Sequence, residues 1–281
     1  MGFLKNELME TPKHILFITQ EMCPFTPEET PLGLLNRRLP EYFQSHGYET
    51  RTFMPKLGEI NERRNQLHEV IRLSGANLII NDADHPLLIK VASIPTARVQ
   101  IYFIDNDDYF TRRKGYEDES GEYPDNDERT IFFGRGVLET MRKLRWTPEI
   151  IHCSGWMSAL IPLYIKRAYA DTLFFKDSKI VLALDGNEYQ KPFPSAFSEK
   201  LLINGVSTND IRSIAGFSVG YEELMRLAIE YSDAFVINSD KVSPRLLNYV
   251  DTQQKPVINL TNCDPESYQA FYDDLVAVKE E

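Results

Sequence analysis

The chain has 281 residues, of which 42% are hydrophobic and 11% aromatic, and this composition excludes a disordered or fibrous protein. Its 31 basic and 42 acidic residues give a net charge of −11, which disfavours binding to nucleic acids and to anionic membranes. The three cysteines, Cys23, Cys153 and Cys263, lie far apart without a Cys-x-x-Cys pair, so we expect neither a disulfide framework nor a thiolate zinc site.

Targeting signals are not evident in the sequence. Residues 1–12 mix charges and contain no apolar run, and no stretch approaches the roughly 20 apolar residues of a membrane span. We therefore expect a cytoplasmic protein without a signal peptide. Nothing in the residue pattern implies a metal or an organic cofactor.

The amino-terminal third predicts a βαβ unit followed by an insertion. Residues 14–19 predict a buried strand, 32–47 an amphipathic helix and 48–54 a second strand. Pro40 falls inside that helix and is expected to kink or shorten it. Residues 69–73, 78–80 and 87–94 predict an inserted antiparallel hairpin or meander with turns at 74–75 and 82–86, and 99–104 returns to the sheet.

The remainder alternates strands and helices after a polar, acidic stretch over 105–127, which we expect to be a functional or mobile loop. Helices are predicted over 127–145, 156–169, 221–231, 242–250 and 266–278, and strands over 150–152, 180–184, 234–238 and 257–258. This alternation predicts a single doubly wound α/β domain over 1–281, with a core from about 13 to 260 and a helical tail over 261–281.

The first strand is followed by a loop that does not predict a phosphate cradle. It holds three prolines, one glycine and the adjacent Glu28 and Glu29 over 21–33, whereas a cradle needs glycines and free amide donors. Asp82, Asp84 and His85 could bind a hard cation, but their spacing lacks the glycine and the distal glutamate of an EF-hand, so an acidic turn is favoured.

Two further groups of residues could be catalytic or could have only a structural role. The carboxylates of 105–128 could include a glycosidase-like pair, or form a solvated loop neutralised by its own basic residues, Arg112, Arg113, Lys114 and Arg129. The aromatic residues of this stretch are expected to anchor the loop or to stack on sugar faces; they are Tyr109, Phe110, Tyr116 and Tyr123. His152 and Cys153 follow a strand, but neighbouring side chains of a strand point to opposite faces, which favours packing over a catalytic dyad.

A series of motifs runs through the chain, at 101–105, 108–110, 123–126 and 128–129, then at 146–162, 189–190 and 229–239. In this order they resemble the motifs of the amino-terminal catalytic domain of bacterial glycogen synthases and plant starch synthases. The resemblance covers roughly residues 14–250. It implies the first Rossmann-like domain of a two-domain GT-B glucosyltransferase, which transfers glucose from ADP-glucose to an α-1,4-glucan.

The resemblance also implies where the working positions of the family fall. The Lys-Thr-Gly-Gly-Leu loop falls at and after Pro27, the aspartate of the His-Asp-Trp-His motif at Gly155, and the active-site histidine at Asp185. The family's catalytic residues are therefore replaced at all of these positions. The lost lysine and the added carboxylates are expected to weaken diphosphate binding, since like charges repel.

By the same resemblance, the residues expected to contact substrate are Trp156, Asp185, Tyr189, Tyr123 and Asn126. The expected ligand is a glucan or a small sugar. A second polypeptide or another copy of the chain is the expected protein partner, and the resemblance implies no metal.

Two functions from different classes remain open. The chain is either a glucosyltransferase half-domain, expected to be inactive alone because it lacks the Lys-Gly-Gly loop and the family's donor-binding domain, or a non-catalytic regulatory protein that binds a sugar or a partner.

Overall fold

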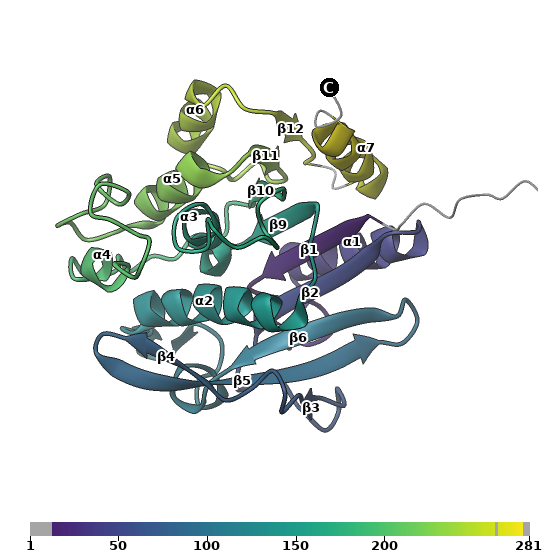
Figure 1. Ribbon diagram of the computed structural model, residues 1–281, viewed down its shortest axis with the longest axis horizontal. Helices are drawn as coiled ribbons and strands as arrows, with labels where there is room; N and C mark the ends of the chain where they lie inside the picture. The colour runs from purple at the N-terminus through teal and green to yellow at the C-terminus, as the bar shows by residue number, and fades with distance from the viewer. Residues whose placement is uncertain (1–12, 262–263, 278–281) are drawn as a thin grey trace, which may run out of the picture.

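The computed structural model describes residues 13–261 and 264–277, so the expectations for residues 1–12 and Cys263 lie outside the described residues. Within these ranges the chain forms a ten-stranded sheet of order β12-β11-β10-β9-β1-β2-β6-β5-β3, with β4 paired to β5 (Figure 1). Neighbours from β12 to β6 pair in parallel, and β5 pairs antiparallel with β6, β3 and β4. The strands are β1 His14–Thr19, β2 Glu49–Pro55, β3 His68–Glu69, β4 Ala76–Ile80, β5 Ala83–Ile94, β6 Val99–Asp105, β9 Ile150–Ser154, β10 Lys179–Leu184, β11 Ala234–Ile237 and β12 Val257–Asn259. A separate small hairpin pairs β7 Glu117–Asp118 with β8 Gly121–Glu122.

Helices cover both faces of the sheet, as the doubly wound prediction requires. In Figure 1, α2 lies in front of the sheet and α1 behind it. The apolar residues of α1 and α7 belong to one core, and those of α2, α3, α5 and α6 to the other. The helices are α1 Pro31–Ser45, α2 Asn126–Leu144, α3 Ile161–Lys166, α4 Phe197–Lys200, α5 Tyr221–Tyr231, α6 Pro244–Thr252 and α7 Pro265–Ala277. No helix of the described part is long and apolar enough to cross a membrane.

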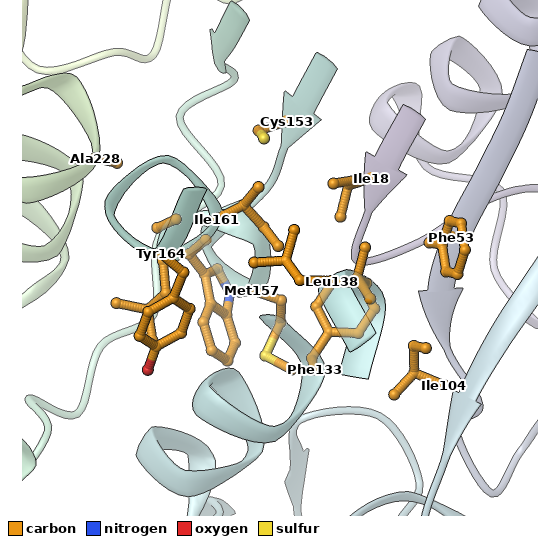
Figure 2. Packing of buried hydrophobic residues seen from close by; sticks show 14 of the residues in the cluster. Ile18, Phe53, Ile104, Phe133, Leu138, Cys153, Met157, Ile161, Tyr164 and Ala228 are labelled. Atoms are coloured by element: carbon orange, nitrogen blue, oxygen red, sulfur yellow. The ribbon is translucent and has the colours of Figure 1, made fainter. Parts of the chain in front are cut away.

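Strand β1 shows why the first apolar run is continuous. Ile15 and Phe17 belong to the core under α1 and α7, whereas Leu16 and Ile18 belong to the core under α2. A strand buried on both faces needs apolar residues at every position. Figure 2 shows Ile18 in the core under α2, with side chains of β2, β6 and α2.

The inserted antiparallel meander is confirmed, but its turn is shorter than predicted. We predicted a turn over 82–86, whereas β5 already begins at Ala83, so Asp84 and His85 lie in a strand. The turn consists of Asn81 and Asp82, which both have positive φ, at 51° and 60°. Two such residues make the tight hairpin connection whose twist matches that of its flanking strands.

Two helices that contain prolines have boundaries different from those predicted. Helix α1 is not shortened at Pro40 but continues to Ser45, because the buried Leu39 and Phe43 on either side pack it onto the sheet. The helix predicted over 156–169 is divided into a 3₁₀ turn, Trp156–Ser158, and α3. Pro162 lies in the first turn of α3, where a missing N–H is tolerated and a helix can begin.

His152 and Cys153 are packing residues on opposite faces of β9, as predicted. The His152 Nδ1 atom lies 2.7 Å from the Tyr272 hydroxyl of α7, and the ring packs near Phe17. Burial lowers the pKa of His152 to about 3, so the ring is neutral. Cys153 belongs to the other core, and burial raises the pKa of its thiol.

We expect Tyr272 to be a main contributor to stability, because it is buried, stacks on Phe43 with ring centroids 5.4 Å apart and contacts His152. Tyr272→Ala should lower the free energy of unfolding by about 3–5 kcal/mol, and Tyr272→Phe by about 1–2 kcal/mol through loss of the contact with His152. Urea denaturation measures both. The exposed Asp274 of the same helix is the control, since Asp274→Ala should change stability by less than about 0.5 kcal/mol. Equal losses for Tyr272→Ala and Asp274→Ala would contradict this role of α7.

Candidate functional site

The sheet topology marks one place where a ligand crevice is expected. From β1 the chain moves to β2 and β6 on one side, and later returns to β9 on the other side of β1. In open parallel sheets, ligands bind beyond the carboxyl ends of the strands at such a switch point. In this chain the switch point lies between Thr19, at the end of β1, and Ser154, at the end of β9. We refer to Gln20, Glu21, Gly155, Asp185 and Asn187, the residues that follow β1, β9 and β10, as the crevice.

Gly155 has a conformation that only glycine readily adopts. Its φ of 79° and ψ of 155° lie in a region that other residues avoid. A Cβ atom here would lie 2.4 Å from the Oε1 atom of Gln20, so the two loops are in close contact. Ser158 holds the Gly155 carbonyl through both its backbone N–H and its hydroxyl. The end of β9 is therefore rigid and close to the end of β1.

Asp185 connects the loops after β9 and β10. Its carboxylate accepts hydrogen bonds from the backbone N–H of Gly155 at 2.9 Å and of Asn187 at 2.9 Å. Asn187 in turn donates from its side chain to Glu21 at 3.4 Å. Burial raises the pKa of Asp185 to about 6. The two N–H donors favour the charged form and lower the pKa, but their effect is smaller than that of burial. Asp185 thus changes charge in the mildly acidic range.

Asp185 interacts with Glu21, and Glu21 in turn interacts with Glu59. The pKa of Glu21 is raised, mainly by burial and also by Glu59, although Thr30 partly offsets the shift. The pKa of Glu59 is raised by burial and by Glu28, although Lys114 partly offsets the shift. These shifts show several acidic side chains close enough to oppose one another's ionisation. The crevice therefore disfavours an additional negative charge.

The first turn of α1 offers little to a phosphate group. Pro31 has no N–H, and the N–H of Gly33 already donates to the Thr30 hydroxyl at 2.8 Å. Glu28 and Glu29 precede this turn and are exposed. A helix amino-terminus of this kind, with one donor absent, another already used and carboxylates beside it, is a poor anion site.

The aromatic residues predicted to contact substrate lie beneath the crevice. Trp156 is only 3% exposed and Tyr189 only 5%. Their ring centroids lie 5.3 Å apart, and Tyr189 stacks on Phe193 at 4.5 Å. The Tyr189 hydroxyl donates to the carbonyl of Val219 at 3.0 Å. The two rings thus form a wall with little free surface, and their role in substrate contact stays a prediction.

Tyr123 and Asn126 are placed by a buried arginine. The Arg129 guanidinium donates to Asn126 Oδ1 at 2.7 Å and to the Gly115 carbonyl at 2.8 Å, and it lies near the rings of Tyr116 and Tyr123. Asn126 also donates to the Tyr116 carbonyl at 2.9 Å. Tyr123 and Asn126 thus use their polar groups inside the chain, where they hold the loop that precedes α2.

Tyr116 anchors this loop, as expected for an aromatic residue of the stretch, but sequence reasoning missed Gln20 and Glu122, the polar residues that join the loop to the crevice. The Tyr116 hydroxyl donates to the Gln20 carbonyl at 2.7 Å, and its ring lies 5.0 Å from that of Trp156. Gln20 is 2% exposed, and its side-chain Oε1 atom has no hydrogen-bond partner among the described residues. Glu122 accepts hydrogen bonds from the backbone N–H groups of Gln190 and Lys191. No motif singled out Gln20 or Glu122, because each is one polar residue in a polar stretch.

The acidic stretch is neutralised partly by residues outside it. Asp105 pairs with Lys90 at 2.9 Å, and Lys200 contacts both Asp127 and Glu128 at 2.7 Å. Two of the predicted cations, Arg112 and Arg113, do pair within the stretch, with Asp108 and Asp125. Carboxylates paired in this way are structural ion pairs rather than a free acid and base.

Metal binding finds no support in the described ranges 13–261 and 264–277, which contain no cluster of three potential ligands. Of the Asp82, Asp84 and His85 group, His85 contacts the Tyr109 hydroxyl through Nε2 at 3.0 Å.

Comparison with known proteins identifies the family. A sequence profile described as the starch synthase catalytic domain matches residues 14–252. The chain belongs to this starch synthase catalytic domain family. It is 37% identical to the glycogen synthase of Chlorobium limicola over 196 residues, which are 69% of this chain and 40% of that protein. It is 35% identical to the glycogen synthase of Chlorobaculum tepidum over 236 residues, or 83% of this chain and 47% of that protein. The chain therefore spans less than half the length of these relatives.

The fold agrees with this assignment. The structure described as the catalytic domain of starch synthase IV from Arabidopsis thaliana, bound to ADP and acarbose, matches with a TM-score of 0.71 and 18% identity. The match covers 89% of this chain and 51% of that one. This chain therefore has the mostly parallel α/β fold of one GT-B half of a starch synthase.

Two of the three positions at which the resemblance places the family's working residues meet in space. Gly155 and Asp185 are joined by a hydrogen bond at the crevice. Pro27 is exposed in the loop between β1 and α1.

Replacing Gly155 by alanine should destabilise the chain. We expect a loss of about 1–3 kcal/mol from the backbone conformation alone, with a further loss from the contact with Gln20. Gly134→Ala is the matched control, because the added Cβ in α2 would have its nearest neighbour at 3.6 Å and alanine favours a helix. Urea denaturation should show the second variant at least as stable as the parent. A Gly155→Ala protein of parental stability would contradict the observed geometry.

Asp185 should make stability depend on pH. Its pKa is higher in the folded state, about 6, than its ordinary value of 3.8, so the folded state gains stability at low pH and loses it as pH rises from about 4 to 6. We expect a loss of about 1–2 kcal/mol for this half-buried group. Comparing the free energy of unfolding at pH 4.5 and 7 isolates the effect, since Asp185→Asn should remove that part of the pH dependence. The same pH dependence in both proteins would show that Asp185 does not cause it.

Proposed function

We propose that this chain is the glucan-binding half of a glucosyltransferase of the glycogen and starch synthase type, and that it does not transfer glucose from ADP-glucose by itself. Family membership supports the first part. The single observation that carries the second part is the group of carboxylates at and beside the crevice: Glu21 and Asp185 belong to it, Glu59 interacts with Glu21, and all three have raised pKa values.

A nucleoside diphosphate and a glucan require different electrostatic properties of a binding site. Two like charges about 4 Å apart repel by about 4 kcal/mol at an effective dielectric constant of 20, so the carboxylates oppose a diphosphate. Sugar hydroxyls are neutral and donate hydrogen bonds readily to carboxylate and amide oxygens. Glu21 and Asp185, which are half-buried, and the exposed Asn187 offer such oxygens in the same crevice. The crevice chemistry therefore favours a polyhydroxylated ligand.

In this proposal the donor half comes from a second polypeptide or from a further part of the same protein, and the cytoplasm is the proposed location. Neither nucleic acid nor a membrane takes part.

The same carboxylates favour a second candidate function, that of a regulatory protein that binds glucan and never transfers glucose. The two candidates differ in whether a donor half restores transfer.

Titration of the isotope-labelled chain with maltoheptaose and with ADP tests the proposal, with the backbone amide NMR signals of Gly155 and Asn187 as local reporters. Maltoheptaose should shift both signals with a Kd in the millimolar range, whereas ADP should not shift them below about 10 mM. Labelled ADP-glucose with glycogen should give no glucosyl transfer by the purified chain.

Charge variants make the test specific. Glu21→Gln combined with Glu59→Gln should increase ADP binding at the crevice by about five- to tenfold, which corresponds to about 1 kcal/mol. Asp251→Asn combined with Asp274→Asn removes two exposed carboxylates on α6 and α7 and should leave it unchanged. Transfer by the purified chain, or ADP binding at the crevice as tight as glucan binding, would refute the proposal. Unchanged signals with maltoheptaose would refute its glucan part.

A further inference from the structure

The structure has a hollow that belongs neither to the crevice nor to the family motifs. It has a volume of about 890 Å³ and lies at the carboxyl end of α2. Its lining residues are Arg72, Leu73, Glu139, Arg142, Lys143, Arg145 and Phe174. Four of the seven are basic and one is acidic, in a chain whose net charge is −11. Helix α2 has 19 residues, about 28 Å, and its first residue, Asn126, contacts the loop beside the crevice. The hollow therefore lies far from the crevice.

Two of the basic groups lack an internal partner. Glu139 accepts hydrogen bonds from Arg142 at 3.0 Å and from Tyr169 at 2.7 Å, so Arg142 is paired. Lys143 donates to the carbonyls of Leu73 and Ser74, which orient it but do not neutralise its charge. Arg72 and Arg145 have neither a carboxylate nor a hydrogen-bond acceptor among residues 13–261 and 264–277. The hollow thus carries an unneutralised positive charge from three side chains.

The conformation of Arg145 is a separate observation. It is the residue that ends α2, and its φ of 51° and ψ of 43° are left-handed. Glycine or asparagine is preferred at such a position because other side chains are strained there. Basic residues do complement a helix carboxyl terminus, but residues within the last turn would do so without this strain. Arg72, from the connection between β3 and β4, gains nothing from the helix.

We propose that this hollow binds a small organic phosphate, such as a nucleoside monophosphate. Arg72 and Arg145 would hold the phosphate oxygens, because guanidinium groups bind phosphate in a two-pronged geometry, and Lys143 would add charge. Phe174 is half-buried at the wall and offers a ring face to the base or sugar. A volume of this size accommodates a nucleotide, whereas inorganic phosphate would fill only part of it.

Titration with AMP and with inorganic phosphate at low salt tests this proposal by calorimetry. AMP should bind with a Kd below about 1 mM, and inorganic phosphate at least tenfold more weakly. Arg72→Gln and Arg145→Gly should each weaken AMP binding at least tenfold. Arg245→Gln, an exposed arginine on α6, should have no effect. Phe174→Leu should weaken AMP binding but leave phosphate binding unchanged.

Arg145→Gly separates binding from folding, because glycine suits the left-handed position. Its urea midpoint should be no lower than that of the parent while its AMP binding is lost. No heat of binding at 10 mM AMP would overturn the proposal, as would parental affinity in Arg145→Gly. Tighter binding of a polyglutamate peptide than of AMP would also overturn it and would assign the hollow to an acidic protein segment.

Discussion

The buried guanidinium of Arg129 is the contact on which the crevice end of the molecule depends. A cation is costly to remove from water, and here directed hydrogen bonds to Asn126 and Gly115 and the faces of surrounding aromatic rings offset that cost. Burial lowers its pKa, yet arginine remains charged in proteins. The loop that precedes α2 is therefore held firmly despite its polar and acidic composition.

This arrangement holds together the loops around the crevice. Arg129 places Tyr116, and Tyr116 contacts both the Gln20 carbonyl and the ring of Trp156. The close approach of Gln20 to Gly155 requires a glycine at that point. The aromatic residues support this geometry from beneath, and the groups left to meet a ligand are carboxylates and amides. Such groups suit hydroxyls better than phosphates, which is the physical basis of the function that we propose.

Charge is separated along the length of α2. Near its amino end lie the carboxylates of the crevice, and at its carboxyl end lie the unpaired Arg72 and Arg145. The net charge of −11 does not reveal this separation, because a net charge does not say where in the structure the charges lie. The regions near the two ends of α2 would therefore select ligands of different chemistry.

The sequence by itself determined the alternation of strands and helices, because burial of apolar residues at period 2 or 3.6 dominates the folding of those segments. Helix α5 has the predicted bounds, and the continuous apolar run of β1 correctly indicated a strand covered on both faces. Gly155 and Asp185 were reached only through the family resemblance. Only the tertiary structure decided that Arg129, predicted to neutralise a solvated loop, is buried, and that Arg72 and Arg145 meet at one hollow. The physical reason is that burial and electrostatic environment come from residues far apart in the chain, which no local pattern brings together.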